Sequence, residues 1–363
     1  FVVISASRQA LNDSLQSSAK IAAESGVEDA KRLIVYCYNK RQSDGSYPPA
    51  DKPLCSEVIG KLSDELEGRG CDKILKPMYD KGGISDVEEE DNNRGYRVRV
   101  GNNGSNNKNE NNEYYQCLKI ATKTDNYQGV VNNLGKSIIV PLRVVNTQNQ
   151  AAVIASLEIE WHRNVTGNDG DDPAKMNGAM GTGLPPAGTW NSGNSNRPAV
   201  LRVERVGVPK GNFTLDQLAD RDTALTLRPS VNGNGGGKDK NRYHLGDYKP
   251  YYQSGRDSIA PNNQYGGKAP IVEAKCDGAD YACKTIFEDS LDTTKTDYYL
   301  RINAIYRSTH FKITAYGQNG KKLYFDGVQP LVDVTGRSSD SFSRIQARLK
   351  PSFDKNADST NWW

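Results

Sequence analysis

Six cysteines are the side chains whose number and spacing point most directly to covalent chemistry. They are Cys37, Cys55, Cys71, Cys117, Cys276 and Cys283. An even number of cysteines in a loop-rich chain is typical of disulfides formed in an oxidising compartment, and six cysteines allow 15 connectivities. Cys276 and Cys283 enclose only the segment DGADYA, so we expect that pair first. The spacing leaves the other four open, and we predict Cys55 with Cys71 and Cys37 with Cys117.

Metal binding is the competing use for such side chains. No C-x-x-C motif occurs, and the three histidines, His162, His244 and His310, are scattered, which argues against zinc. The segment NDGDD could offer calcium the carboxylates of Asp169, Asp171 and Asp172. Its spacing does not match an EF-hand loop, so a solvated acidic loop is the simpler interpretation.

Motifs for catalysis are missing from the sequence. We find no G-x-S-x-G, no H-E-x-x-H and no dinucleotide fingerprint after a strand. The glycine run before Lys238 lacks the first glycine of a phosphate-binding loop and the Ser or Thr that follows its lysine. His310 precedes Phe311 in an alternating strand, so we expect it on the solvent side. We therefore predict a protein that is not an enzyme and needs no cofactor.

Composition favours an exported surface protein. The chain has 34 glycines, and its 19 tyrosines far outnumber its seven phenylalanines. The formal charge of +3 over 363 residues is close to balanced and does not indicate a basic surface for binding nucleic acid.

Residues 1–38 carry the strongest periodic signal in the chain. Apolar side chains recur there at helical spacing, while the intervening positions are polar and include an i,i+4 pair of Glu28 with Arg32. The candidate assembly positions on the apolar stripe are Ile4, Leu11, Leu15, Ala22 and Gly26. A helix of this length extends roughly 57 Å, which exceeds one ordinary domain, so part of it should protrude. Its apolar start at Phe1–Ile4 has no polar cap.

The segment RQALNDSLQSSAKIAAESGVEDAKRLI resembles the amphipathic part of the N-terminal helix in PilX-like type IV pilins. The resemblance implies a subunit that is anchored in the inner membrane, extracted by an assembly machine and polymerised with itself and other pilins into an extracellular pilus. In that family an apolar half-helix precedes this segment. We expect that the sequence shown lacks it, together with the early glutamate that it carries.

After the helix the pattern changes to strands. Residues 54–67 read as a short helix, and β-branched and aromatic runs with period-two alternation follow. We expect strands at residues 96–100, 114–121, 137–145, 155–161, 199–208, 224–227, 271–275, 299–306, 311–316, 322–325, 331–334 and 343–349. Gly317 to Gly320 should form one hairpin turn and Gly336 to Ser341 another. The closing strands resemble, more weakly, those of large PilX-like subunits.

These elements predict an α+β, pilin-like fold, with a long N-terminal helix packed on an antiparallel, β-rich head that carries long loop insertions. The expected division is an assembly helix at residues 1–38 and a head at residues 39–363, subdivided near residues 164–198. Within the polar stretch 231–269, Tyr248, Tyr251 and Tyr252 are candidate surface contacts, because exposed tyrosines provide contact area at low entropic cost. Aromatic anchors of an ordinary loop are the alternative.

The functional expectation is a structural subunit of an extracellular type IV pilus that exposes its head for adhesion or motility. Before assembly it would be membrane-anchored. A secreted or surface-anchored adhesin that binds carbohydrate and does not polymerise is the main alternative, and an exported hydrolase ranks third.

Overall fold

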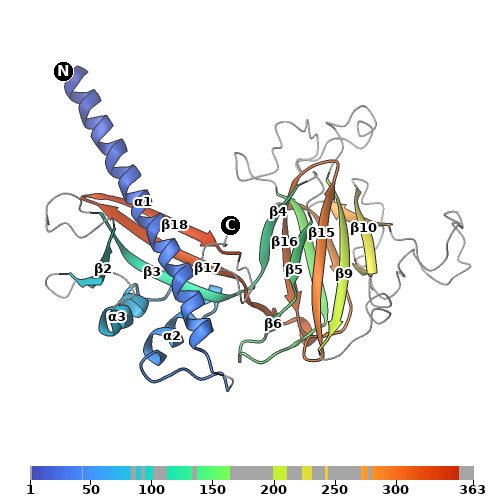
Figure 1. The fold of residues 1–363 in the computed structure, drawn as a ribbon. Helices are drawn as coiled ribbons and strands as arrows, with labels where there is room; N and C mark the ends of the chain where they lie inside the picture. Colours follow the sequence, from blue (N-terminus) through green and yellow to red (C-terminus); the bar gives the residue numbers. More distant parts are fainter. Residues whose placement is uncertain are drawn as a thin grey trace, which may run out of the picture. The chain divides into compact units, whose positions relative to one another are not determined.

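The structure, a computed structural model, describes residues 2–42, 44–82, 87–90, 95–100, 113–132, 137–163, 199–210, 223–230, 242–243, 271–276 and 280–350. The chain divides into two compact units (Figure 1). Unit 1 combines Phe1–Thr124 with Asp326–Trp363, and unit 2 is Asp125–Phe325.

The predicted fold class, an α+β pilin-like fold with one helix packed on a single β-rich head, is wrong. Strands make up 51% of the structure and helices 23%, and the strands form several sheets. A long helix does form, but it covers one sheet of unit 1 only. Contacts divide the chain at Thr124 and Asp326, so neither side of the expected boundary at residue 38 is a unit of its own. The subdivision expected near residues 164–198 lies outside the described residues.

Unit 1 contains the α-helices of the described chain. They are α1 (Val2–Lys40), α2 (Lys52–Val58) and α3 (Asp72–Lys81), with a 3-10 turn, η1, at Ser63–Glu65. The helix predicted at 54–67 is therefore split, because Ile59 is extended and Gly60 has a φ of +84°. Pro77 inside α3 masked its helical pattern in the sequence, although the helix buries Ile74 and Met78.

The sheet of unit 1 has the order β1-β2-β3-β17-β18. Its strands are β1 (Val87–Glu89), β2 (Tyr96–Arg99), β3 (Glu113–Thr124), β17 (Tyr324–Ser338) and β18 (Ser341–Arg348). The strands expected at 322–325 and 331–334 are largely one long strand, β17. The predicted turn also shifts, because Gly336 pairs with Ser343 and Ser338 with Ser341, so that only Ser339 and Asp340 connect the strands.

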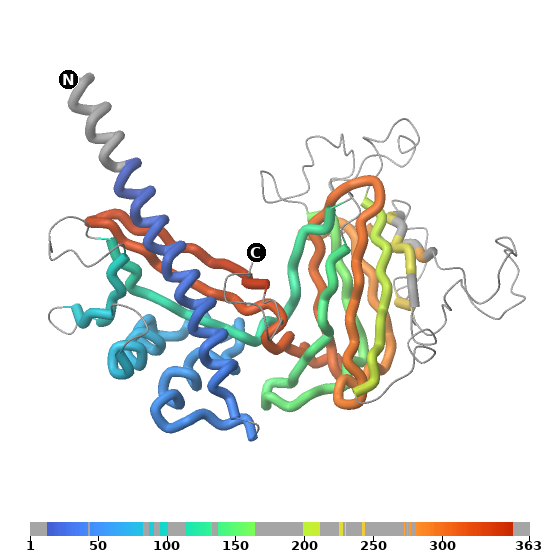
Figure 2. The backbone as a smooth tube through the Cα atoms, viewed as in Figure 1, coloured from blue at the N-terminus to red at the C-terminus, as the bar shows by residue number. Residues whose placement is uncertain are grey.

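One hydrophobic core fills unit 1 between the helices and this sheet. It combines Ala23, Ala30, Leu33 and Ile34 of α1 with residues of α2 and α3 and with inward-facing strand residues. On the strands, Tyr115, Val332 and Val334 are nearly or fully buried. Figure 2 shows α1 (blue) crossing the red strands β17 and β18. The alternating face of β17 and β18 thus buries the helix stripe by the hydrophobic effect.

All six cysteines form disulfides, which confirms the prediction of oxidised cysteines, but two of the predicted pairs are wrong. The bridges are Cys37–Cys55, Cys71–Cys117 and Cys276–Cys283. Cys37 near the end of α1 meets Cys55 of α2, because the two helices pack together. Cys71 precedes α3 and meets Cys117 of β3, against which α3 lies. Sequence spacing alone could not reveal the unpredicted α3 that sets this pairing.

Apart from a 3-10 turn at Gln318–Gly320, the regular elements in the described residues of unit 2 are strands. They are β4 (Tyr127–Val131), β5 (Ile138–Pro141), β6 (Val144–Val145), β7 (Val153–Ile154), β8 (Ser156–Arg163), β9 (Val200–Pro209), β10 (Thr223–Ser230), β11 (Arg242–Tyr243), β12 (Ile271–Cys276), β13 (Tyr281–Phe287), β14 (Leu291–Asp292), β15 (Thr296–Ile305) and β16 (Thr309–Tyr316). The main sheet has the order β4-β16-β8-β13-β12-β10-β9-β15-β5. Its pairs are antiparallel except β10 with β12 and β11 with β13.

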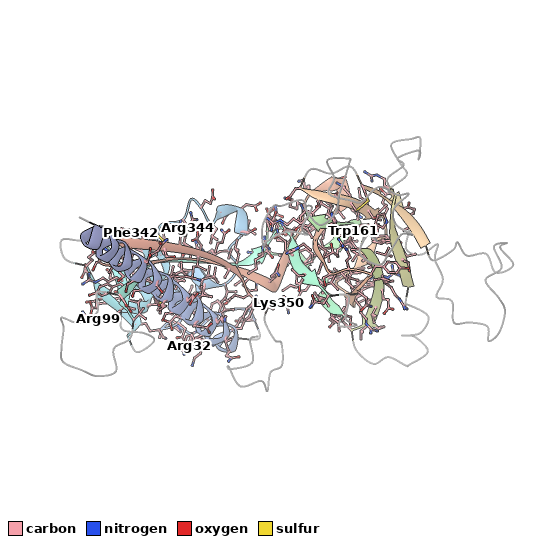
Figure 3. The ribbon with its side chains drawn as sticks, turned by 90° about the horizontal axis from the view of Figure 1, so that it is seen from above. Arg32, Arg99, Trp161, Phe342, Arg344 and Lys350 are labelled. Atoms are coloured by element: carbon pink, nitrogen blue, oxygen red, sulfur yellow. A yellow bond between two sulfur atoms is a disulfide. The ribbon has the colours of Figure 1, made fainter. Side chains whose placement is uncertain are left out.

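The core of unit 2 lies on the inward face of this sheet. Leu157, Ile159 and Trp161 of β8 are buried, and the Trp161 indole N–H donates to the carbonyl of Ala199 at 3.1 Å (Figure 3). Tyr127 stacks on Phe311 at 6.0 Å between ring centres. Burial raises the pKa of Tyr127 to about 12.

The first predicted hairpin turn is confirmed. Asn319 and Gly320 both have a φ of 69°, which is the left-handed region that a tight turn requires, and the Gly317 N–H donates to the Lys321 carbonyl.

Unit 2 is an insertion between two neighbouring strands of unit 1. It follows β3 and precedes the unit 1 part of β17, and these strands are adjacent in the sheet. Near this junction burial lowers the pKa of Lys123, while the charge of Asp326 opposes the shift. The core of unit 1 contains no residue of unit 2.

Unit 1 should therefore fold without its insertion. We expect a chain in which a short Gly-Ser linker replaces residues 125–325 to unfold cooperatively on heating, and to form the Cys37–Cys55 and Cys71–Cys117 bridges. Circular dichroism and peptide mapping under non-reducing conditions check this. An aggregated chain with scrambled disulfides would show that unit 1 depends on unit 2.

Candidate assembly surface

The closest packing in unit 1 joins the backbone of α1 to the backbone of β17. A Cβ atom added at Gly336 would lie 2.1 Å from the Ala19 carbonyl oxygen and 2.4 Å from the Ala23 nitrogen. On the helix side, a Cβ atom at Gly26 would lie 2.5 Å from Cγ1 of Val334. No side chain fits at these two points, so glycine is required at both.

Small residues predominate in the buried stripe of α1 between Ala19 and Ala30. Ala19, Ala22, Ala23 and Ala30 are fully buried, and Gly26 is buried with them. Ala22 and Gly26 were expected to contact other subunits. The structure places both within unit 1, where they allow the helix to approach its own sheet.

The N-terminal part of α1 has a different environment. Asp13, Ser14, Gln16 and Ser17 are exposed, Leu15 is half-buried, and full burial begins only at Ala19. Ile4 and Leu11 lie within α1, but their side chains are outside the described set. In the described chain, no helix combines the length and the apolar character needed to cross a bilayer.

From Asp13 onward, the outward side of α1 is mainly charged, and Ile21 is an apolar residue on it. Lys20 pairs with Glu24 at 3.8 Å, and Lys31 pairs with Glu28 at 2.5 Å. Ile21, the residue after Lys20, is 52% exposed. Its position off the apolar stripe was visible in the sequence, but a single exposed isoleucine is common and gave no signal.

The C-terminal end of α1 is fastened by a buried carboxylate. Asp51 accepts a hydrogen bond from the Tyr36 hydroxyl of α1 at 2.5 Å and pairs with Lys81 of α3. Both hydrogen bonds lower the pKa of Asp51, with the Lys81 contact the larger cause, and the same contact raises the pKa of Lys81. Together with Cys37–Cys55, this cluster ties three helices at one point.

The face of the unit 1 sheet opposite the helices is lined with arginine. The guanidinium of Arg97 lies 4.1 Å from the ring centre of Tyr114, and Arg99 pairs with Glu88 at 3.1 Å. On β18, Arg344 donates from Nε to Asp333 at 2.8 Å, and Phe342 is 54% exposed beside it (Figure 3). Since these arginines are paired with nearby acids, the face is covered mainly by its own ion pairs.

The remaining predicted site residues cannot be placed. The calcium candidates Asp169, Asp171 and Asp172 and the surface-contact candidates Tyr248, Tyr251 and Tyr252 lie outside the described residues. Among the described residues, no cluster of three or more histidine, cysteine, aspartate or glutamate side chains could hold a metal ion. His310 is half-buried on β16.

Comparison with known proteins identifies no relative. The chain matches no protein-family model, no curated protein and no solved structure.

The close approach of α1 to β17 makes a direct prediction for Gly336. Gly336→Ala should lower the free energy of unfolding by about 1–3 kcal/mol, because the new methyl group overlaps the α1 backbone, which is held in place. Gly68→Ala is the control, since the nearest atom there is 4.0 Å away. Urea unfolding compares the two variants. Equal stability of Gly336→Ala and the unmodified chain would contradict the packing described.

The Asp51 cluster predicts a pH dependence. A lowered carboxyl pKa stabilises the fold above the ordinary carboxyl value of about 4, and this contribution is lost as the pH falls through the lowered value. Asp51→Asn should therefore cost about 1–3 kcal/mol at pH 7 and less at pH 3. Asp80→Asn removes an exposed pair with Lys76 and should change little. A cost for Asp51→Asn that is the same at both pH values would refute this account.

Proposed function

We propose that this protein is a structural subunit of an extracellular type IV pilus filament and that it polymerises through the N-terminal part of α1. The observation that carries the proposal is the distribution of burial along this helix. Unit 1 encloses the stripe from Ala19 onward, while Asp13 to Ser17 remain exposed or half-buried on the same continuous helix. A helix that extends beyond its own core presents a surface that a neighbouring subunit can cover.

The resemblance of residues 7–34 to PilX-like pilins supports the same role. On this proposal the remaining assembly positions are Ile4, Leu11 and Leu15, because Ala22 and Gly26 are already packed within unit 1. The partners are other copies of the chain, other pilins and the inner-membrane assembly machinery. The protein is membrane-anchored before assembly and extracellular afterwards, and its role is not catalytic.

The disulfides are consistent with this location. Cys37–Cys55 joins α1 to α2, and Cys71–Cys117 joins the start of α3 to β3. Bridges of this kind typically stabilise a fold by about 2–5 kcal/mol and form in oxidising compartments outside the cytosol.

On this proposal the two units have different roles. Unit 1 contains the helix and builds the filament, and unit 2 is displayed for surface attachment. The second candidate is an adhesin that does not polymerise. It is favoured by the division of the chain into two compact units, because unit 2 is compact without including α1.

Leu11 provides the test between the candidates. In cells that produce the filament, Leu11→Asp should abolish filaments while the purified protein still folds, because an unpaired carboxylate in an apolar helix interface costs several kcal/mol. Gln16→Asp adds the same charge at an exposed position and should leave assembly intact. Electron microscopy and sedimentation measure the filaments.

Two outcomes would contradict the proposal. Normal filaments from Leu11→Asp would remove this part of α1 from the filament interface. Complete absence of filaments from cells that export the unmodified protein would favour the adhesin.

A further inference from the structure

The register of three neighbouring strands in unit 2 aligns apolar side chains on the solvent side of the sheet. Tyr299 of β15 lies opposite Pro141 of β5 and opposite Val206 of β9. These strands are adjacent in the sheet (Figure 1). Ile139 lies two positions before Pro141 on β5, and Val208 lies two positions after Val206 on β9. Both residues are therefore on the same face of the sheet as Tyr299. We call these five residues the apolar strip.

The apolar strip is on the outside of unit 2. Val140, Gly207 and Leu300, which alternate with residues of the strip, are buried, so the alternation of the strands directs the strip outward. Ile139 is 61% exposed, and the other four residues are half-buried. Contiguous exposed apolar residues on a protein surface commonly mark an interaction site.

Ion pairs border the strip on both sides. Arg301 lies opposite Ile139 on one side and opposite Glu204 on the other. The carboxylate of Glu204 pairs with Arg301 at 3.4 Å and with Arg202 at 2.7 Å. Arg301 also donates to the Ser137 hydroxyl at 3.1 Å. Beside Val208 on the other side, Asp297 pairs with Lys210 at 3.5 Å.

Each carboxylate of this rim is therefore already engaged by a cation. A charged partner would have to displace these pairs, whereas a neutral partner can share their remaining hydrogen-bonding capacity.

Extension of the sheet by a second copy is disfavoured at this place. β5 ends the strand order, so its outer edge is the point where another strand would pair. The Leu142 N–H donates to the Tyr298 carbonyl, so the backbone of Leu142 faces β15. Because backbone groups alternate in direction along a strand, those of Ile139 and Pro141 point to the outer edge. Pro141 has no N–H, and a single amide donor cannot build a ladder.

We propose that the apolar strip binds a neutral carbohydrate. Sugar rings combine apolar C–H faces with a periphery of hydroxyl groups. Tyr299 and Val206, which are paired across two strands, provide an aromatic and an aliphatic side chain for contact with such a ring, and Tyr299 adds a hydroxyl group. Glu204 and Asp297 accept hydrogen bonds from hydroxyl groups, and Arg301 donates to them. Three strands make the row about 10 Å wide, which suits an extended saccharide.

The inference rests on the surface-attachment part of the proposed function and is tested separately from assembly. The purified full chain is incubated with cellulose, chitin and starch beads, and the bound fraction is measured. Ile139→Asn should weaken retention about tenfold, because Ile139 is the most exposed residue of the strip and its apolar contact would be lost. Tyr299→Ser is the second strip variant. Val130→Asn, at a 43% exposed position on β4 of the same unit, is the matched control.

Circular dichroism establishes that all three variants are folded, and they should form normal filaments. The proposal is overturned if the unmodified chain is retained by none of the beads, or if Val130→Asn weakens retention as much as the strip variants. It is also overturned if sedimentation shows a dimer that Ile139→Asn dissociates, because the strip would then join two copies. Filaments from Leu11→Asp would disprove the assembly role without affecting retention on beads.

Discussion

The organisation of unit 1 depends on how closely the backbone of α1 approaches the backbone of β17. Gly336 and Gly26 each stand where an added Cβ atom would lie 2.5 Å or less from the opposite element, and alanines occupy most of the stripe from Ala19 to Ala30. Close approach brings Leu33 and Ile34 into the same core as α2 and α3. The position of the helix in turn determines which of its residues are left uncovered, and the proposed assembly role concerns those residues.

Local patterns in the sequence predicted the elements better than their assembly. The helix at the N-terminus, most of the strands and the hairpin at Asn319–Gly320 follow from periodicity and turn chemistry. The fold class was wrong because unit 1 is formed by two segments that are distant in sequence. No periodic signal indicates that β3 and β17 are neighbours, and the same long-range packing determined the cysteine pairs.

The candidate surfaces were predicted unequally for a related reason. The apolar stripe of α1 was visible, but a stripe does not say whether its own sheet or another subunit covers it, and Ala22 and Gly26 proved to be covered within unit 1. The apolar strip of unit 2 left no signal at all. Pro141, Tyr299 and Val206 come from three separate segments, and only strand register places them in one row.

The insertion of unit 2 between β3 and β17 also fixes how tension would travel through the molecule. A pull on unit 2 enters unit 1 through two adjacent strands at once, so the load is divided between them. On β3 it reaches Cys117, whose bond to Cys71 transfers force covalently to the start of α3. On β17 it meets the long ladder with β18. An attachment made by unit 2 would therefore be held by a disulfide on one path and by many cooperative hydrogen bonds on the other.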